Sequence, residues 1–340
     1  MDTAMIQTQG LTKHFKANNT TIEAVVGIDL TVEQGEMVAL LGPNGAGKST
    51  ALRMLTTLIA PTAGVARVGG HDVTTDQEKV RRRIGYIGQG NGAGHAQRGR
   101  DELTMQGRVY GMSKAAARAR AAELIESLDL GEVADRKVTA LSGGQRRRLD
   151  IAMGLIHAPD LLFLDEPSTG LDPQNRANLQ EHIVSLRKQH DTTVVLTTHY
   201  LDEADALAER VVIVDHGRIV ADDTPARLKA NFAGDRIAVT FSSPADAVRA
   251  ASRTRIVDRR AHVEQRERSL DVRVQEGSQV LPRLLRAYDA EGTPALSAAL
   301  GRPTLDDVFL NLTGRSLREG RAAANATATL THIATQEVSA

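Results

Sequence analysis

Short apolar runs alternate with helical patterns between residues 37 and 221. An apolar run of this length, bounded by turn residues, is typical of a buried strand. The runs are residues 37–41 (MVALL), 84–87, 161–164 (LLFL) and 193–197 (TVVLT), followed by a strand, turn and strand over 211–221. Helical spacing occurs at residues 48–58 and over most of 101–135. Strands that alternate with helices predict an α/β fold with a mainly parallel sheet.

One helix has a clear start and a clear apolar face. Asp172 is a good N-cap, and Pro173 after it suits the first helical position. Leu179, Ile183 and Leu186 then fall on one side. These features predict an amphipathic helix that begins at residue 173.

The pattern changes near residues 230–234, which predicts that a first domain ends at about residue 232. Five patterned segments follow, two of them helical at 244–251 and 280–288, and they predict a small α+β domain over residues 235–315. The segments are residues 237–241, 244–251, 270–274, 280–288 and 304–312. Residues 318–340 are rich in Ala and Thr, and we expect them to be disordered.

Composition excludes several classes of protein. The 340 residues contain 42 Lys plus Arg and 42 Asp plus Glu, so the formal net charge is zero. A nucleic-acid partner is therefore not expected, and three arginines at residues 146–148 are interpreted as a solvated or phosphate-facing helix surface. There is no cysteine, so neither a disulfide framework nor a cysteine metal site is possible. No stretch has the ~20 apolar residues that a membrane-spanning helix needs, so the chain is expected not to cross a membrane.

A glycine-rich sequence joins the strand at residues 37–41 to the helix at 48–58. It fits the phosphate-binding pattern G-x-x-x-x-G-K-[ST]. Its residues are Gly42, Pro43, Asn44, Gly45, Ala46, Gly47, Lys48 and Ser49, with Thr50 next. The glycines let backbone N–H groups point at phosphate oxygens, Lys48 adds a full charge, and Ser49 can bind Mg²⁺. The sequence predicts a site for a nucleoside triphosphate; the alternative is a turn that only links strand to helix.

Polar residues follow two of the predicted strands. Asp165 and Glu166 come directly after residues 161–164, and His199 comes shortly after 193–197. Open α/β sheets bind ligands at the carboxyl ends of their strands. Asp165 is placed to hold Mg²⁺, Glu166 to activate the attacking water, and His199 to bond the γ-phosphate. The alternatives are carboxylates that end a strand or cap a helix, and a structural histidine.

Five motifs between residues 6 and 230 occur in the order found in the ABC ATPase family. They are the phosphate loop, Gln89 in GYIGQ, LSGGQ at 141–145, DEPSTGLD at 165–172, and Thr198-His199. The chain resembles that family over this stretch. The resemblance implies the P-loop NTPase fold of ABC ATPases, a mainly parallel sheet with an antiparallel N-terminal subdomain and a helical subdomain at about 90–157. It also implies hydrolysis of ATP with Mg²⁺.

The resemblance gives roles to further residues. Gln89 is similar to the glutamine that senses Mg²⁺ and water, so the implied metal-site residues are Ser49, Gln89 and Asp165. Phe15 occupies the position of the aromatic residue that stacks on adenine. Four residues resemble those that close over the γ-phosphate of a second subunit: Ser142, Gly143, Gly144 and Gln145. The alternatives are a polar strand-end residue for Gln89, a core residue for Phe15, and an ordinary helix cap at 142–145.

Residues 64–73 and 302–309 are similar to the ATP-binding subunits of daunorubicin/doxorubicin-resistance drug exporters. That resemblance implies a homodimer of ATPase subunits and a separate membrane permease of about six transmembrane helices. It places the chain at the cytoplasmic face of the membrane, energising efflux of drugs or other hydrophobic compounds. Residues 90–103 are more glycine-rich than in that subfamily, in a region expected to contact the permease.

Two other functions stay open at this point. A non-transport ABC ATPase usually carries two cassettes or a long coiled coil, whereas this chain has one cassette and no sustained heptads. A different phosphate-loop enzyme, such as a small-molecule kinase, would transfer phosphate to an acceptor other than water, and LSGGQ argues against it.

Overall fold

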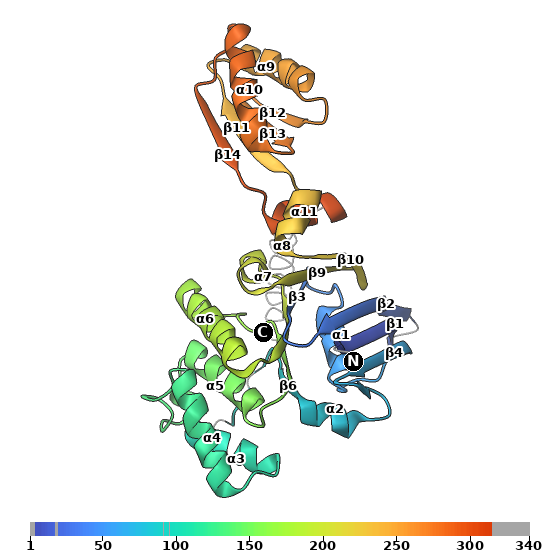
Figure 1. The fold of residues 1–340 in the computed structure, drawn as a ribbon, viewed down its shortest axis with the longest axis vertical. Helices are drawn as coiled ribbons and strands as arrows, with labels where there is room; N and C mark the ends of the chain where they lie inside the picture. The colour runs from blue at the N-terminus through green and yellow to red at the C-terminus, as the bar shows by residue number, and fades with distance from the viewer. Residues whose placement is uncertain (1–3, 18–19, 91, 95, 315–340) are drawn as a thin grey trace, which may run out of the picture. The chain divides into compact units, whose positions relative to one another are not determined.

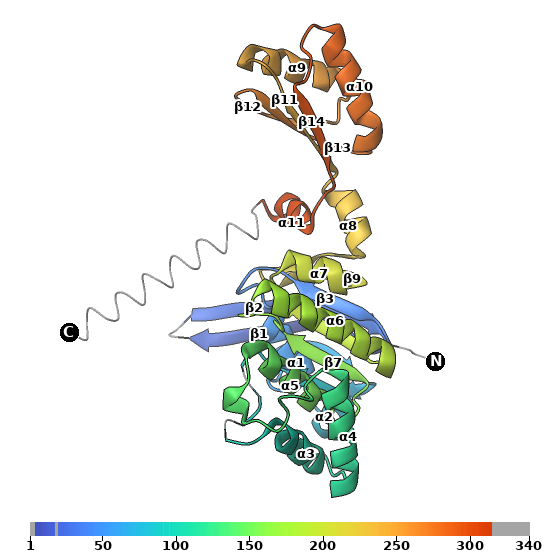
Figure 2. The same ribbon diagram turned by 90° about the vertical axis from the view of Figure 1, so that its left-hand side faces the viewer.

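The computed structural model describes residues 4–17, 20–90, 92–94 and 96–314. The chain divides into two compact units, Met1–Asp223 and Thr224–Ala340, shown in Figures 1 and 2. The tail predicted at residues 318–340 lies outside the described residues. The predicted domain boundary near residue 232 stays a prediction.

A six-stranded sheet forms the centre of the first unit (Figure 1). Its order is β10-β9-β3-β8-β7-β6, and every pairing is parallel except that of β9 with β10. The strands are β3 (Met37–Leu41), β6 (Ile84–Ile87), β7 (Leu161–Asp165), β8 (Thr193–Thr198), β9 (Arg210–Asp215) and β10 (Arg218–Asp223). Every residue of β3, β7 and β8 is buried, which explains their continuous apolar runs. The predicted parallel sheet is confirmed.

Seven α-helices accompany this sheet in the described part of the first unit. They are α1 (Lys48–Leu55), α2 (Gln77–Arg83), α3 (Gly99–Val109), α4 (Lys114–Ser127), α5 (Gly143–Leu155), α6 (Pro173–His190) and α7 (Leu201–Leu207). The predicted start of α6 is confirmed, because the Asp172 side chain accepts a hydrogen bond from the N–H of Asn175. Helix α1 ends before the predicted residue 58, since Thr57 has a positive φ of 63°.

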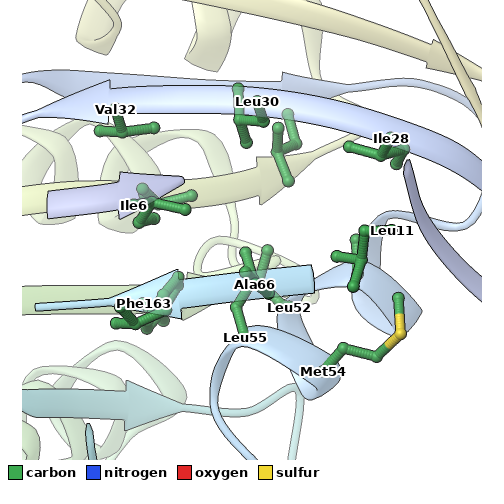
Figure 3. Packing of buried hydrophobic residues seen from close by; sticks show 14 of the residues in the cluster. Ile6, Leu11, Ile28, Leu30, Val32, Leu52, Met54, Leu55, Ala66 and Phe163 are labelled. Atoms are coloured by element: carbon green, nitrogen blue, oxygen red, sulfur yellow. The ribbon is translucent and has the colours of Figure 1, made fainter. Parts of the chain in front are cut away.

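An antiparallel sheet covers part of the first unit's core. Its order is β2-β1-β4-β5. The strands are β1 (Ala4–Ala17), β2 (Thr20–Glu33), β4 (Ala63–Val68) and β5 (His71–Asp72). Figure 3 shows Ile6, Leu30 and Ala66 of this sheet in the same apolar cluster as Leu52 of α1 and Phe163 of β7. This packing fixes α1, and with it the phosphate loop, against the strands.

The second unit is built around another antiparallel sheet, of order β12-β13-β11-β14. Its strands are β11 (Asp235–Thr240), β12 (His262–Arg266), β13 (Ser269–Val274) and β14 (Ser297–Gly301), and its helices are α8 (Pro225–Phe232), α9 (Pro244–Val257), α10 (Gly277–Ala290) and α11 (Leu305–Thr313). Helices α9 and α10 share one core with β11 and β13, in which the rings of Phe241 and Tyr288 meet edge to face. The expected small α+β fold is confirmed. The edge strands β12 and β14 were not predicted, because most of β12 and all of β14 is exposed and carries no alternating apolar pattern.

Among the described residues, none of the helices combines the length and apolar character that crossing a bilayer requires.

Candidate nucleotide site

The loop between β3 and α1 surrounds a cavity of about 420 Å³. Nine of the ten lining residues are ones that carry the sequence motifs, and the tenth is Ala24. The lining consists of Ala24, Asn44, Gly45, Ala46, Gly47, Lys48, Ser49, Thr50, Gln89 and Glu166. The structure therefore brings the phosphate loop, Gln89 and Glu166 together, although they lie far apart in the chain.

Gly47 occupies a position that excludes a side chain. It is the N-cap of α1, with φ of 103°, and a Cβ there would lie 2.3 Å from the carbonyl oxygen of Ala24. Gly45 also has a positive φ, of 81°, but a Cβ on it would meet nothing within 4 Å. A side chain at residue 45 would therefore meet only backbone strain, whereas a side chain at residue 47 would meet both strain and a steric clash.

We expect Gly47→Ala to destabilise the protein by on the order of 2–4 kcal/mol, because strain and a backbone clash add. Gly45→Ala is the matched control, since it carries the strain alone and should cost about 1 kcal/mol. Thermal unfolding of both variants without nucleotide checks this difference. Equal melting temperatures for the two variants would contradict the steric argument.

Lys48 is buried in the loop, with only 4% of it exposed. Its Nζ donates to the carbonyl oxygens of Gly42 at 2.7 Å and Pro43 at 3.0 Å, and it lies 3.9 Å from Glu166 Oε1. Burial lowers the pKa of Lys48, and the carboxylates of Glu166 and Asp165 offset this effect only in part. These carbonyl oxygens and the Glu166 carboxylate hold the ammonium at the cavity, where it can also bind a phosphate oxygen.

Asp165, Ser49, Gln89 and Thr197 form a polar cluster at the carboxyl ends of β7 and β8. Asp165 Oδ1 accepts hydrogen bonds from Ser49 Oγ and Thr197 Oγ1, both at 2.7 Å, and Gln89 Nε2 donates to Ser49 Oγ at 3.2 Å. Asp165 is fully buried, and its Oδ2 has no hydrogen-bond partner among the described residues. A buried carboxylate oxygen beside a serine hydroxyl suits a hard cation such as Mg²⁺. Among the described residues, no group of three or more His, Cys, Asp or Glu is arranged to hold a metal ion.

Thr197 belongs to this cluster although it is part of none of the sequence motifs. Its hydroxyl donates to Asp165 and accepts a hydrogen bond from the N–H of Glu166 at 3.0 Å. The sequence shows only that a threonine ends the strand-like run at residues 193–197.

Glu166 and His199 face each other next to Lys48. Glu166 Oε2 lies 3.2 Å from His199 Nδ1 and accepts a hydrogen bond from Thr169 Oγ1 at 3.1 Å. The backbone of Glu166 has a φ of 49°, an uncommon conformation that two hydrogen bonds from its N–H to Thr197 maintain. Burial raises the pKa of Glu166, but the contact with His199 and the charge of Lys48 outweigh burial, so the pKa is lower than usual. Glu166 is therefore ionised at neutral pH and able to accept a proton.

Phe15 lies at the surface of the antiparallel sheet. It is 39% exposed, and the Lys13 ammonium stands 5.2 Å from the centre of its ring. This exposure excludes the alternative of a buried core residue. A stacking contact with adenine stays a prediction.

Residues 142–145 begin helix α5 and do not line the cavity. Ser142 Oγ accepts from the N–H of Gln145, and the Gln145 side chain accepts from the N–H of Ser142, which together form a capping box. Gly144 is in close contact with α6, since a Cβ on it would lie 2.6 Å from Asn175 Oδ1. The cap explains Ser142 and Gln145 locally, and neither residue is among those that line the cavity of the same chain.

The interpretation of residues 146–148 as a helix surface is wrong for Arg147. Only 8% of Arg147 is exposed, and its guanidinium donates to three backbone carbonyls, of Gly88, Asp165 and Pro167. Three consecutive arginines resemble a basic surface, and only the fold shows which one points inward.

The sheet, the loop and the two carboxylates together define a phosphate-loop NTPase.

Comparisons with known proteins agree with this class. A family model described as ABC transporter matches residues 25–169. The chain is 44% identical over 318 residues to the daunorubicin/doxorubicin resistance ATP-binding protein DrrA of Streptomyces peucetius, covering 92% of this chain and 93% of that protein. It is 34% identical to the linearmycin resistance ATP-binding protein LnrL of Bacillus subtilis, covering 93% of this chain and 100% of that protein. The ATP-binding cassette MJ0796, solved as a dimer in a post-hydrolysis state with ADP and Pi, matches with a TM-score of 0.60 and 28% identity, over 65% of this chain and 98% of that one.

This chain belongs to the ABC transporter family as an ATP-binding subunit, and it is an ATPase. The predicted resemblance to ABC ATPases of the daunorubicin/doxorubicin-resistance type is confirmed.

Proposed function

We propose that this chain hydrolyses ATP to drive efflux through a separate membrane permease. The observation that carries the proposal is that Lys48, Ser49 and Glu166 line one cavity, with the Asp165 carboxylate bonded to the Ser49 hydroxyl beside it. A lysine and a helix N-terminus suit the phosphates, and an ionised carboxylate suits the water that attacks them.

In this proposal Ser49 and Asp165 hold Mg²⁺, with Gln89 next to them. The fit rests on the unpartnered, buried Oδ2 of Asp165 and on the Ser49 hydroxyl beside it. The ion, when bound, neutralises charge on the phosphates. Glu166 deprotonates the attacking water, and His199 orients it together with the γ-phosphate. Phe15 stacks on the adenine ring.

Two copies of the chain are proposed to form each complete site. Residues 142–145 lie outside the cavity of their own chain, yet they place two glycines at the N-terminus of α5, where an anion is favoured. A head-to-tail homodimer would bring these residues to the phosphates of the partner. The dimeric state of the MJ0796 cassette supports this arrangement.

The permease is proposed to be a separate membrane protein, with the ATPase bound at its cytoplasmic face. The names of the relatives point to drugs, daunorubicin and doxorubicin among them, as the transported class. The second unit has no proposed part in the chemistry.

Export can be tested in inverted membrane vesicles that contain this chain and the membrane protein encoded beside its gene. We expect ATP to drive uptake of daunorubicin into these vesicles. Vesicles with the membrane protein alone should show only passive uptake, because nothing couples ATP to it. Uptake that is equally ATP-dependent without this chain would contradict the proposal.

A further inference from the structure

Arg147 connects helix α5 to the two loops that carry Gln89 and Glu166. Its Nη1 donates to the carbonyl of Gly88 at 2.8 Å, directly before Gln89. Its Nε donates to the carbonyl of Pro167 at 2.8 Å, and its Nη2 donates to the carbonyl of Asp165 at 3.3 Å. One guanidinium thus bonds the carbonyls of the residues before and after Glu166 and of the residue before Gln89.

Arg147 is buried, so its charged guanidinium depends on these hydrogen bonds to replace those it would make with water. Desolvation lowers the pKa of the guanidinium, and the carboxylates of Asp150, Asp165 and Glu203 partly compensate. A buried charge is tolerated only where its hydrogen-bonding groups are satisfied. The planar fork of arginine can reach three carbonyls at once, whereas a lysine ammonium on a flexible stem holds no such fixed geometry.

Asp150, one turn further along α5, contacts the chain after Gln89, as Arg147 contacts it before Gln89. Only 4% of Asp150 is exposed, and its Oδ1 accepts from the N–H groups of Gly92 at 3.0 Å and Ala93 at 3.1 Å. Gln89 therefore lies on a segment that α5 contacts before it, through Arg147, and after it, through Asp150. The same helix begins at residues 142–145.

We infer that Arg147 is a positioning residue through which α5 sets Glu166 and Gln89 relative to the phosphate loop. The three carbonyls that Arg147 bonds belong to Gly88, Asp165 and Pro167, none of which lines the cavity or belongs to the phosphate loop. Arg147 therefore acts on the hydrolytic step and leaves nucleotide binding largely unchanged. Displacement of a catalytic group by about 1 Å costs roughly 100-fold in rate. This inference rests on the proposed roles of Glu166 and Gln89.

The test compares Arg147→Lys and Arg147→Met with Arg148→Met in the full-length chain. Arg148 is the matched control, because it is a neighbouring, mostly buried arginine on the same helix, but it bonds Asn178 and contacts His182 and Asp129. We expect kcat for ATP hydrolysis to fall roughly 100-fold in Arg147→Met and about 10-fold in Arg147→Lys, with KM for ATP within about twofold of the parent value. Arg148→Met should keep the parent kcat within about twofold.

Rates are referred to the number of sites that bind a non-hydrolysable ATP analogue, so unfolded protein does not count as a loss of kcat. Arg147→Lys keeps the charge and most of the volume, and it serves where Arg147→Met does not fold. The inference is overturned if Arg147→Lys has the same kcat as Arg148→Met. It is also overturned if Arg147→Lys raises the KM for ATP about 10-fold and leaves kcat at the parent value.

A separate variant distinguishes this inference from the proposed function. If Glu166→Gln is inactive while both Arg147 variants behave like Arg148→Met, only the positioning role of Arg147 is rejected. If Glu166→Gln hydrolyses ATP at the parent rate, the proposed role of Glu166 is rejected as well.

Discussion

Lys48→Ala is expected to lose ATP binding and hydrolysis, each by at least about 100-fold. The substitution removes the one ammonium at the cavity lining and deprives the carboxylates of Glu166 and Asp165 of its positive charge. An anionic triphosphate would then enter a site whose remaining side-chain charges repel it. Equilibrium binding of a fluorescent ATP analogue and release of phosphate measure the two losses.

Lys79→Ala is the control for Lys48→Ala. Lys79 lies on α2, and its exposed side chain pairs with Asp76 three residues away. The same loss of charge at that position should leave binding and hydrolysis unchanged, since exposed pairs contribute little. A Lys48→Ala protein that binds and cleaves ATP like the parent would remove the basis of the proposed nucleotide site.

Glu166→Gln is expected to keep ATP binding and to lose hydrolysis by roughly 1,000-fold. Glutamine has nearly the same volume and can still accept from Thr169, but it cannot take a proton from water. ATP should therefore persist in the site. In the proposed homodimer, bound ATP holds the two chains together, so a stable dimer should accumulate on addition of ATP and Mg²⁺.

Single-turnover hydrolysis and size-exclusion chromatography with light scattering check the two parts of this expectation separately. Glu78→Gln, an exposed change on α2, is the control and should behave like the parent. Glu166→Gln that stays monomeric with ATP bound would reject the dimer. Glu166→Gln with unaltered hydrolysis would reject Glu166 as the base.

Much of the first unit could be predicted because its signals are local. Strands β3, β7 and β8 are buried on both faces, so each shows as an uninterrupted apolar run in the sequence. The start of α6 was equally readable, since Asp172 and Pro173 act on the backbone within one turn. The edge strands of the second unit have no such signal, because pairing with a neighbour decides them.

Among the candidate site residues, those in local motifs could be predicted from the sequence, and those defined by distant contacts could not. Lys48 and Ser49 belong to a motif of fixed spacing, and Asp165 and Glu166 end a recognisable strand, so the sequence pointed to all four. Thr197 and Arg147 were missed or misread. Their importance lies in contacts with residues 165–167 and 88, which the chain brings near only after folding.

By itself the sequence determined the class of this protein, the positions of its principal strands along the chain and the residues of its phosphate loop, since short-range geometry and burial leave their pattern directly in the chain. Only the tertiary structure decided which of three adjacent arginines bonds the carbonyls next to Gln89 and Glu166 and that residues 142–145 stand apart from their own chain's cavity. It also showed how two distant loops are bonded to one helix. The physical reason is that a buried charge must find its partners across the fold, and a linear pattern does not record which distant carbonyls will supply them.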